Sequence, residues 1–385
     1  MALIVRLKAD QRVSASSTTP HFPLAIIRLP AQGFIDQDIR SDMTVDTQTR
    51  VEVSDFGDAA TEYRAARESA AVIDVSDRTQ LEMTGADRHS FLHNFTTNDI
   101  KALPSGRACE AFLCNVKGRI LGHVFIFAGD ETTWVESVPG QGDFLTSHLE
   151  RYHLLEDFTL TDRTTDRGEL LVTGPESSSR LTAAGIDLSH LENLSCSSTS
   201  VDFEGGLALD VRRVDVFGAP TFLIAADGAA IDVLWTKLTA VDVTPAGRDV
   251  LQTLRIEAAF PWYGVDLSDE NLGQEACRTS QAISFTKGCY LGQEPIARIH
   301  AMGHVNRELR RFVIDSDTCP PAGVAILNPN EESKEVGRVT SVGWSWQLNR
   351  PIGLGTVRTK FAKPESEVVL ATDLKIGARV FADAS

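Results

Sequence analysis

A lone cysteine stands in the segment FTKGCYLGQEPIARIH, among residue types that can support thiol or anion chemistry. Gly288 and Gly292 allow the backbone to turn tightly or to approach a ligand closely. Pro295 suits the first turn of a helix. The amides at such a helix start, together with the Lys287 ammonium, favour anions and the thiolate form of Cys289. Composition alone also permits a structural glycine turn around a buried cysteine.

The same part of the chain carries a local excess of positive charge. From residue 287 to residue 311 there are five basic residues and two acidic ones, in a chain whose formal net charge is -16. His300 and His304 stand four residues apart, as zinc ligands on a helix do, but no glutamate follows the first histidine and Gly303 weakens a helix. We therefore interpret the two histidines as part of a polar loop and predict no metal site.

The composition limits the class of protein. The 385 residues suggest two or three domains with an ample core. The net charge of -16 argues against general nucleic-acid binding, and the lack of an apolar run of about 18 residues argues against a membrane span. The six cysteines include no CxxC pair and no zinc-like cluster, so no disulfide framework is expected and a reducing cytoplasm fits best.

Alternating helix and strand patterns are expected to position the cysteine segment. Residues 58–73 have helical spacing and lead into a strand, and three antiparallel strands follow over 108–138, so an α+β class is predicted. The order strand, helix, two strands, helix over 167–240 is that of a ferredoxin-like lobe. A helix is predicted over 247–260, and the short apolar runs after residue 304 predict a small β-barrel.

We expect three regions along the chain. Residues 1–51 form an N-terminal extension, for which a poorly ordered segment, a targeting segment and a start codon placed too early are open alternatives. Residues 52–304 form an α+β region of two lobes, with a boundary near residue 165 and a return to the first lobe near residue 245. Residues 305–385 form the barrel.

KGCYLGQE, residues 287–294, resembles the signature of the YgfZ-type folate-binding proteins. These are relatives of the aminomethyltransferase, or T-protein, of the glycine cleavage system, and they assist iron–sulfur cluster assembly or repair. The resemblance covers nearly everything from residue 52 onward, and RIEAAFPWYGVDL and EVGRVTSVGWSWQLNRPIGLGTVR resemble parts that both families share. It implies a three-lobed ring, in which ferredoxin-like α+β lobes and a small C-terminal β-barrel surround a channel that admits folate.

Three departures from the T-protein pattern favour the YgfZ branch. The T-protein's catalytic aspartate falls at Gly122 and His123 here, and the tyrosine just upstream is replaced by Glu110. The T-protein's pterin-holding glutamate falls in DVFGAPT, residues 215–221, which contains no glutamate. Aminomethyl transfer needs a carboxylate to handle charge at the folate nitrogen, so we do not expect a functional aminomethyltransferase.

The resemblance implies tetrahydrofolate, or a derivative of it, as the ligand. Arg255 is expected to pair with a folate carboxylate, and Tyr263 or Trp262 to stack on the flat ring system. Cys289 is the expected functional thiol, and Lys287 is expected to activate it or to contact an anionic ligand. The remaining motif residues are expected to shape the loop: Gly288, Tyr290, Gly292, Gln293, Glu294 and Arg298.

The predicted function is that of a tetrahydrofolate-binding accessory protein for iron–sulfur clusters, with iron–sulfur client or assembly proteins as partners. A stably bound metal is not expected, since a single cysteine cannot hold a cluster that usually takes four ligands. The chain is expected to be a cytoplasmic monomer that binds neither nucleic acid nor membrane. Two alternatives stay open: an aminomethyltransferase of the glycine cleavage system, and a non-catalytic folate-binding scaffold or regulator.

Overall fold

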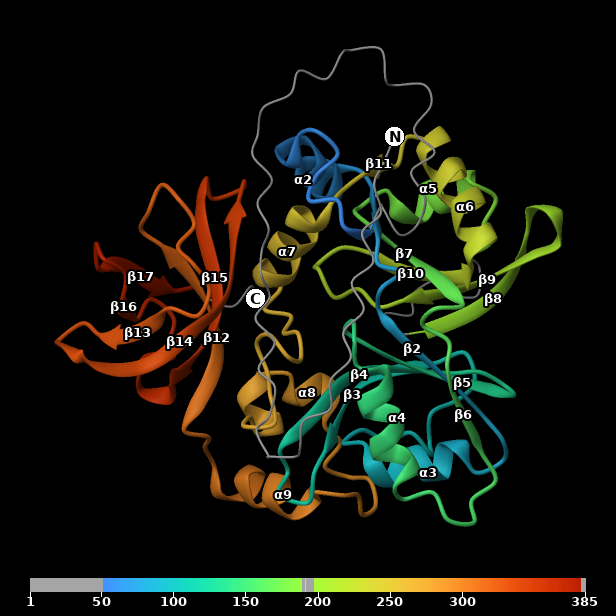
Figure 1. Cartoon of the computed structure of the whole chain (residues 1–385), viewed down its shortest axis with the longest axis horizontal. Coiled ribbons are helices and arrows are strands. Elements are labelled where there is room, and N and C mark those ends of the chain that lie inside the picture. The colour runs from blue at the N-terminus through green and yellow to red at the C-terminus, as the bar shows by residue number, and fades with distance from the viewer. Residues whose placement is uncertain (1–50, 189–190, 192–196, 382–385) are drawn as a thin grey trace, which may run out of the picture. The chain divides into compact units, whose positions relative to one another are not determined.

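Two β-sheets and a closed barrel make up the described part of this computed structural model, which comprises residues 51–188, 191 and 197–381 (Figure 1). The predicted N-terminal extension, residues 1–51, lies outside these residues except for its last one. Within the described ranges, no helix is long and apolar enough to cross a membrane.

The first sheet is antiparallel and has the strand order β3-β4-β5-β2-β6. Its strands are β2 (Thr79–Thr84), β3 (Ala108–Cys114), β4 (Ile120–Ala128), β5 (Thr132–Ser137) and β6 (Thr159–Asp162). The three strands predicted over 108–138 are confirmed as β3, β4 and β5. Helices α3 (Arg88–Phe95) and α4 (Gly142–Glu150) share one hydrophobic core with this sheet, through side chains such as Phe91 and Leu145.

The second sheet has the order β11-β1-β7-β10-β9-β8, with β1 and β11 parallel and the other neighbours antiparallel. Its strands are β1 (Ala71–Asp74), β7 (Arg167–Thr173), β8 (Ser197–Phe203), β9 (Leu207–Arg213), β10 (Thr221–Asp227) and β11 (Thr244–Pro245). The short helix η2 (Glu204–Gly206) joins β8 to β9. Helices α5 (Ser177–Ala183) and α6 (Gly228–Ala240) bury Leu181 and Leu234 in one core with this sheet.

The helix predicted over 58–73 is correct only in its first part. Helix α2 (Ala59–Glu68) begins after Asp58, whose carboxylate accepts a hydrogen bond from the backbone amide of Ala60. The residues of β1 follow it as a strand between β7 and β11, and all four are buried. A continuous apolar run of this length has no periodicity that separates a strand from a helix, which is why the sequence pattern fails here.

A second core of the β1–β11 sheet contains α2 and α7 (Arg248–Glu257), which confirms most of the helix predicted over 247–260. Tyr63 and Leu254 from these helices pack with Ile73 of β1. The same core includes Phe127 of the first sheet. This shared core therefore holds the two sheets together.

The chain between α7 and the barrel packs back onto the first sheet. It contains η3 (Gly273–Ala276), α8 (Thr279–Ala282) and α9 (Gln293–Met302). Ile283, Tyr290 and Ile296 from this stretch share a core with Phe112 of β3 and Ile120 of β4. The cysteine segment is therefore mounted beside β3, the edge strand of the first sheet.

The strands after residue 306 close into a six-stranded barrel of order β12-β15-β14-β13-β16-β17. They are β12 (Arg307–Ile314), β13 (Ala325–Asn328), β14 (Glu331–Ser345), β15 (Arg350–Arg358), β16 (Glu367–Leu370) and β17 (Ile376–Val380), with η4 (Thr359–Phe361) after β15. Ile256 of α7 packs against Leu309 and Leu354, which joins the barrel to the helices. The predicted α+β class with a small C-terminal barrel is confirmed.

Candidate functional site

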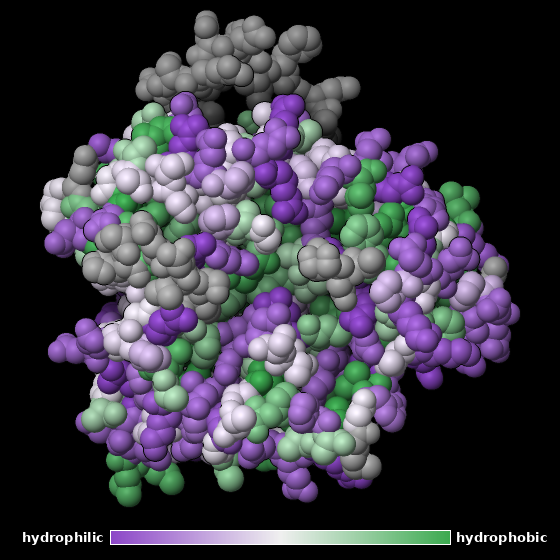
Figure 2. Space-filling view, turned by 180° about the vertical axis from the view of Figure 1, so that it is seen from behind, coloured by the Kyte–Doolittle hydropathy of each residue, from purple (hydrophilic) through white to green (hydrophobic). Residues whose placement is uncertain are grey.

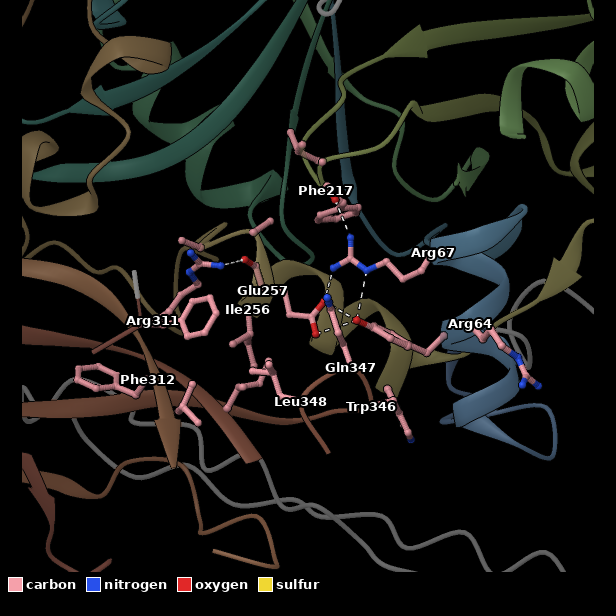
Figure 3. A pocket seen from close by; sticks show the side chains of 18 of the residues that line it. Arg64, Arg67, Phe217, Ile256, Glu257, Arg311, Phe312, Trp346, Gln347 and Leu348 are labelled. Carbon is pink, nitrogen blue, oxygen red and sulfur yellow. Dashed lines mark hydrogen bonds and ion pairs between the residues drawn. The ribbon is translucent and has the colours of Figure 1, made fainter. Parts of the chain in front are cut away.

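A cavity of about 1240 Å³, called the central cavity below, lies where α2, the C-terminal end of α7, strand β12 and the turn after β14 meet (Figure 3). Its apolar lining comes from these elements and from the loop between β9 and β10: Tyr63, Phe217, Ile256, Phe312, Trp346 and Leu348. Its polar lining includes arginines, a thiol and three carboxylates: Arg67, Cys277, Arg278, Arg310, Arg311, Asp58, Glu68 and Glu257. Apolar walls with a few placed polar groups are typical of a small-molecule site.

Glu257, the last residue of α7, is a carboxylate of this lining that is held by three donors. The Tyr63 hydroxyl lies 2.9 Å from both of its oxygens, Arg67 donates to Oε2, and Ser345 Oγ donates to Oε1 at 2.7 Å. Burial raises the pKa of Tyr63 to about 12, so the phenol stays protonated and can donate. The carboxylate is thus fixed in one orientation by side chains of α2 and β14.

Helix α2 supplies two of these donors because Tyr63 and Arg67 stand four residues apart, on one face of the helix. Arg67 also donates to the backbone carbonyl of Phe217 at 3.0 Å. It therefore ties the β9–β10 loop to Glu257. Figure 3 shows Arg67 directed at Glu257, whereas Arg64 extends away from it.

Arg278 at the cavity wall is held by a buried ion pair with Glu110 of β3. Arg278 Nε lies 2.8 Å from Glu110 Oε1, and His123 Nε2 of β4 lies 2.7 Å from the same oxygen. Burial alone would raise the pKa of Glu110, but hydrogen bonds from Arg278 and the nearby His123 outweigh burial and lower that pKa to about 2. The carboxylate therefore stays ionised at neutral pH.

His123 and Gly122 face opposite sides of β4, as neighbours on a strand do. A Cβ at Gly122 would lie 2.8 Å from Leu145 of α4, so this position belongs to the helix-covered face. The His123 ring packs near Phe260 on the other face, with ring centroids 5.2 Å apart. Of the two residues predicted to replace the T-protein's aspartate, only His123 lies on the side of Arg278.

Two arginines of β12 line the barrel side of the central cavity, and one of them, Arg310, forms an ion pair with Glu308. Arg311 donates to the backbone carbonyl of Glu257, and its guanidinium lies 4.9 Å from the Phe381 ring. Arg310 donates to Cys277 Sγ at 2.9 Å. Cys277 is exposed and follows η3 with a left-handed φ of 56°. This side of the cavity therefore suits the anionic part of a ligand.

Arg255, predicted to bind a folate carboxylate, is 1% exposed, and its guanidinium contacts protein groups on all sides. Nη1 donates to Asp266 at 2.7 Å, Nη2 donates to Ser341 Oγ at 2.6 Å, and Nε donates to Gln252 Oε1 at 2.8 Å. The Trp262 ring centroid lies 4.5 Å from the guanidinium. These contacts join α7 to the following loop and to β14.

Arg255, Trp262 and Tyr263 do not line the central cavity. Tyr263 is half-buried against the core that contains Tyr290 and Leu267, and burial raises its pKa to about 12. The structure thus brings Arg255 and Trp262 together, but as part of a packed joint. Their contact with a folate stays a prediction.

Lys287 of the cysteine segment is 7% exposed and contacts the end of α3. Its ammonium donates to the backbone carbonyls of His93, Thr96 and Asn98, the last two at 2.7 and 2.8 Å. Three carbonyls match the three protons of an ammonium group. Burial lowers the pKa of Lys287 to about 8. Lys287 therefore anchors the segment to the first sheet, and its predicted action on Cys289 stays a prediction.

Gly292 is required by a close approach to the turn between β3 and β4. Its φ is 82°, and a Cβ there would lie 2.4 Å from the backbone oxygen of Asn115. It is also the N-cap of α9, so the helix expected near Pro295 begins at Gln293. Tyr290 is buried in the core beneath this loop. These motif residues hold the loop in place.

Cys289 is exposed, between the buried side chains of Lys287 and Tyr290, and it does not line the central cavity. The other predicted loop residues lie at the surface or are half-buried: Gly288, Gln293, Glu294 and Arg298. The structure therefore presents the thiol to solvent and uses its immediate neighbours for packing.

The two histidines near the cysteine are both exposed. His300 of α9 stacks on Phe285 with ring centroids 3.7 Å apart, and His304 follows the helix. Among the residues that the structure describes, no group of three or more potential ligands is placed to hold a metal ion. Within the described ranges, no disulfide joins any of the cysteines: Cys109, Cys114, Cys277, Cys289 and Cys319.

Two family models match the chain. The GCVT N-terminal domain matches residues 45–285, and the glycine cleavage T-protein C-terminal barrel domain matches residues 307–383. The chain belongs to the T-protein superfamily. This confirms the relationship that the sequence motifs predict at the level of the superfamily, while the YgfZ branch stays a prediction.

Relatives of this T-protein superfamily member include enzymes named aminomethyltransferase. That of Symbiobacterium thermophilum is 28% identical over 83% of this chain and 87% of its own length, and that of Deinococcus deserti is 32% identical over 54% and 58%. The crystal structure of the glycine cleavage system aminomethyltransferase T from Bartonella henselae matches with a TM-score of 0.76 at 20% identity, over 84% of this chain and 88% of that chain. This structural match supports the fold.

Several residues of the central cavity are not singled out by any motif in the sequence. Tyr63 and Arg67 have a spacing of four, but surface helices commonly show that spacing. Trp346 and Cys277 lie in short segments without any repeated pattern. Because the lining comes from elements far apart in this T-protein-like chain, only the tertiary structure brings it together.

Proposed function

We propose that the central cavity binds a reduced folate, either tetrahydrofolate or a derivative of it. The observation that carries this proposal is the composition of the cavity, with aromatic walls, a fixed carboxylate and an arginine-rich side. Trp346 and Phe217 can pack on a flat pterin or benzoyl ring. Arg278 and Arg311 suit the carboxylates of the glutamate tail.

Glu257 is the group that would select a pterin. A carboxylate offers about four acceptor sites, and donors from Tyr63, Arg67 and Ser345 occupy three of them. The remaining site can accept a hydrogen bond from a ring N–H or from an exocyclic amine. Leaving a buried donor of the ligand without an acceptor costs about 1 to 3 kcal/mol, so Glu257 should contribute strongly to affinity.

For the role of the bound folate, we propose an accessory function in iron–sulfur cluster assembly or repair that uses Cys289. Support comes from the exposure of this thiol between Lys287 and Tyr290, which are both buried. Because these neighbours hold the loop on the first sheet, the thiol has a fixed place at which a partner can reach it. A cluster there would take its other ligands from the partner, since such clusters usually need four.

Aminomethyl transfer is the second candidate, and the names of the relatives favour it. This chemistry needs a group that can handle charge at the folate nitrogen. Glu110 is engaged by Arg278 and His123, and Glu257 is engaged by its three donors. Glu110 does not line the central cavity, and we assign Glu257 to binding the ring system of the folate, so folate binding without this transfer is our first candidate.

The remaining expectations belong to the same proposal. The partners would be iron–sulfur client or assembly proteins, and the chain would act as a monomer in the cytoplasm without contacting nucleic acid or membrane. A folate-binding scaffold or regulator is the outcome in which folate binds and neither activity is found.

Folate binding is tested by titrating tetrahydrofolate into the purified chain without oxygen. We expect saturable binding by the wild type and at least about tenfold weaker binding by Glu257→Gln. The matched control is Glu176→Gln, which removes a surface carboxylate that pairs with Arg180 and should leave the affinity unchanged. Equal affinities in all three proteins would refute this site.

The role of the folate is tested by two assays. We expect no turnover with an aminomethylated lipoyl protein and tetrahydrofolate, and turnover would establish the second candidate instead. In cells that lack the chain, we expect Cys289→Ser to leave iron–sulfur enzymes impaired. Cys319→Ser, which changes another exposed cysteine, should restore them. Full restoration by Cys289→Ser would contradict a role for the motif thiol.

A further inference from the structure

A second cavity, of about 660 Å³ and called the basic pocket below, lies between the linker that follows α9 and the end of the barrel. Its lining contains five residues with basic side chains and none with an acidic one: His304, Arg307, Lys334, Arg358 and Lys360. The chain as a whole has a formal net charge of -16. A concave region lined by one sign of charge attracts ligands of the opposite sign.

Arg307 and Arg358 are direct cross-strand partners in β12 and β15. Side chains in this position lie about 5 Å apart at Cβ, and like charges there destabilise the sheet. Among the described residues, none forms an ion pair with either arginine or with Lys360. An anion between the two guanidinium groups would remove this repulsion, because each can bind a carboxylate or phosphate through two hydrogen bonds.

The acidic residues near the basic pocket are engaged elsewhere or only loosely. Glu308, next to Arg307 in the chain, forms an ion pair with Arg310. Lys334 has Glu331 at 3.5 Å, in a pair with both side chains more than half exposed. The positive charge of the basic pocket is therefore available to bind an anionic ligand. The face of the molecule in Figure 2, where the barrel lies at the right, is mostly hydrophilic there.

The basic pocket lies beside the central cavity. Alternation along β12 places Arg307 on the same face as Leu309 and Arg311, which line the central cavity. Two residues of a strand span about 7 Å. Arg310, also in the central cavity, donates from Nε to the carbonyl of Ala362 at 2.9 Å, and Ala362 directly follows the basic pocket's Phe361. A ligand that leaves the central cavity along β12 would extend about 7 Å from Leu309 to reach Arg307 of the basic pocket.

We propose that the basic pocket binds the row of carboxylates in the poly-γ-glutamyl tail of a folate whose ring system lies in the central cavity. This inference rests on the proposed folate binding. A γ-glutamyl chain offers one carboxylate per unit, which suits the pair Arg307 and Arg358 followed by Lys360. Its methylene groups can contact Val305 and Phe361, the apolar part of the lining. A single phosphate would match the charge but would leave most of the 660 Å³ unfilled.

The test compares tetrahydrofolate carrying one glutamate with tetrahydrofolate carrying five, by calorimetric titration of the full chain at low salt. We expect the five-glutamate form to bind the wild type at least about tenfold more tightly. In the double variant Arg307→Gln/Arg358→Gln, the advantage should fall to less than about threefold while the affinity for the one-glutamate form stays the same. The matched control Arg350→Gln/Arg379→Gln removes two exposed barrel arginines that have acidic partners, and it should keep the advantage.

The outcomes separate this inference from the proposed function. Measurable binding of the one-glutamate form with no gain from the longer tail would overturn the tail site alone. A gain that survives in Arg307→Gln/Arg358→Gln, or that disappears equally in the control, would also overturn it. No binding of either form would overturn the proposed folate site, and the tail site with it. Inorganic pyrophosphate that competes with the one-glutamate form would show a simple anion in the central cavity and contradict the division into two sites.

Discussion

The cysteine loop and the central cavity show two different relations between sequence and chemistry. The loop has a compact signature, yet Lys287, Tyr290 and Gly292 are used for packing and only Cys289 among these four is presented to solvent. The central cavity has no single compact signature: Glu257 and Trp346 lie in two separate segments that resemble T-proteins, and the other aromatic rings and arginines come from further distant elements. The residues of a short motif can therefore serve to hold a loop in place, whereas the residues of a binding site come from separate segments of the chain.

The buried cations sharpen this comparison. Lys287 and Arg255 are both expected from the sequence to meet a ligand, and both donate their protons to groups of the protein itself. Arg278 and Arg311 also donate to protein groups, but these two side chains line the central cavity. Residue type and spacing do not distinguish a cation packed inside the protein from a cation at the wall of a cavity, because the difference lies in the surrounding residues.

The largest expected effect concerns access to the thiols. Cys114 is fully buried, and burial raises its pKa to about 12, whereas Cys289 is exposed. Since the thiolate is the reactive form, burial of Cys114 lowers its alkylation rate by about a thousandfold through the pKa alone. Alkylation of the native protein, with peptide mapping by mass spectrometry, should modify Cys289 in the time in which Cys114 stays intact. Equal rates would show that the loop is not presented as described.

The next effect is on stability. Lys287→Met removes the donor for three backbone carbonyls and should lower the free energy of unfolding by about 3 kcal/mol in urea denaturation. Cys289→Ala, two residues away, should change it by less than about 0.5 kcal/mol because the side chain is exposed. If Lys287→Met were as stable as the wild type but inactive in cells, the lysine would act on the ligand or the thiol, as the motif suggests.

The smallest effect, about 2 kcal/mol between pH 7 and about pH 3, is the pH dependence of the pair Glu110–Arg278. The pKa of Glu110 is about 2 in the folded chain, below its ordinary value, so its stabilisation is fully present above about pH 4.5 and is lost as the pH falls toward 2. The wild type should exceed Glu110→Gln by about 3 kcal/mol at pH 7, and more than half of this difference should be gone near about pH 3. Urea unfolding at a series of pH values measures it. A difference that stays constant with pH would mean that the carboxylate is not held as an ion.

The sequence predicts the class of fold well because its strands alternate and its turns are marked. The three strands over 108–138 and the barrel after residue 304 are found where they are expected. The prediction over 58–73 fails at β1, because a short buried strand that begins with three apolar residues looks like the end of a helix. The partner strand that settles it, β7, lies about 100 residues further along the chain.

The site could be predicted only in part for the same reason. The spacing in KGCYLGQE predicts a glycine turn before a helix, and Gly292 and α9 confirm it. The use of Lys287 depends on where the carbonyls at the end of α3 lie, and the selection of Glu257 depends on α2 and β14. Both sets of contacts join residues that are far apart in the chain, so no local sequence pattern predicts them.

The central claim is that a reduced folate lies in the central cavity against Glu257. A crystal structure of the chain with tetrahydrofolate tests it most directly. We expect density for the pterin within hydrogen-bond distance of Glu257, with the rings beside Trp346. Density for the ligand against Arg255 and Trp262, or beside Cys289 with the central cavity empty, would contradict it.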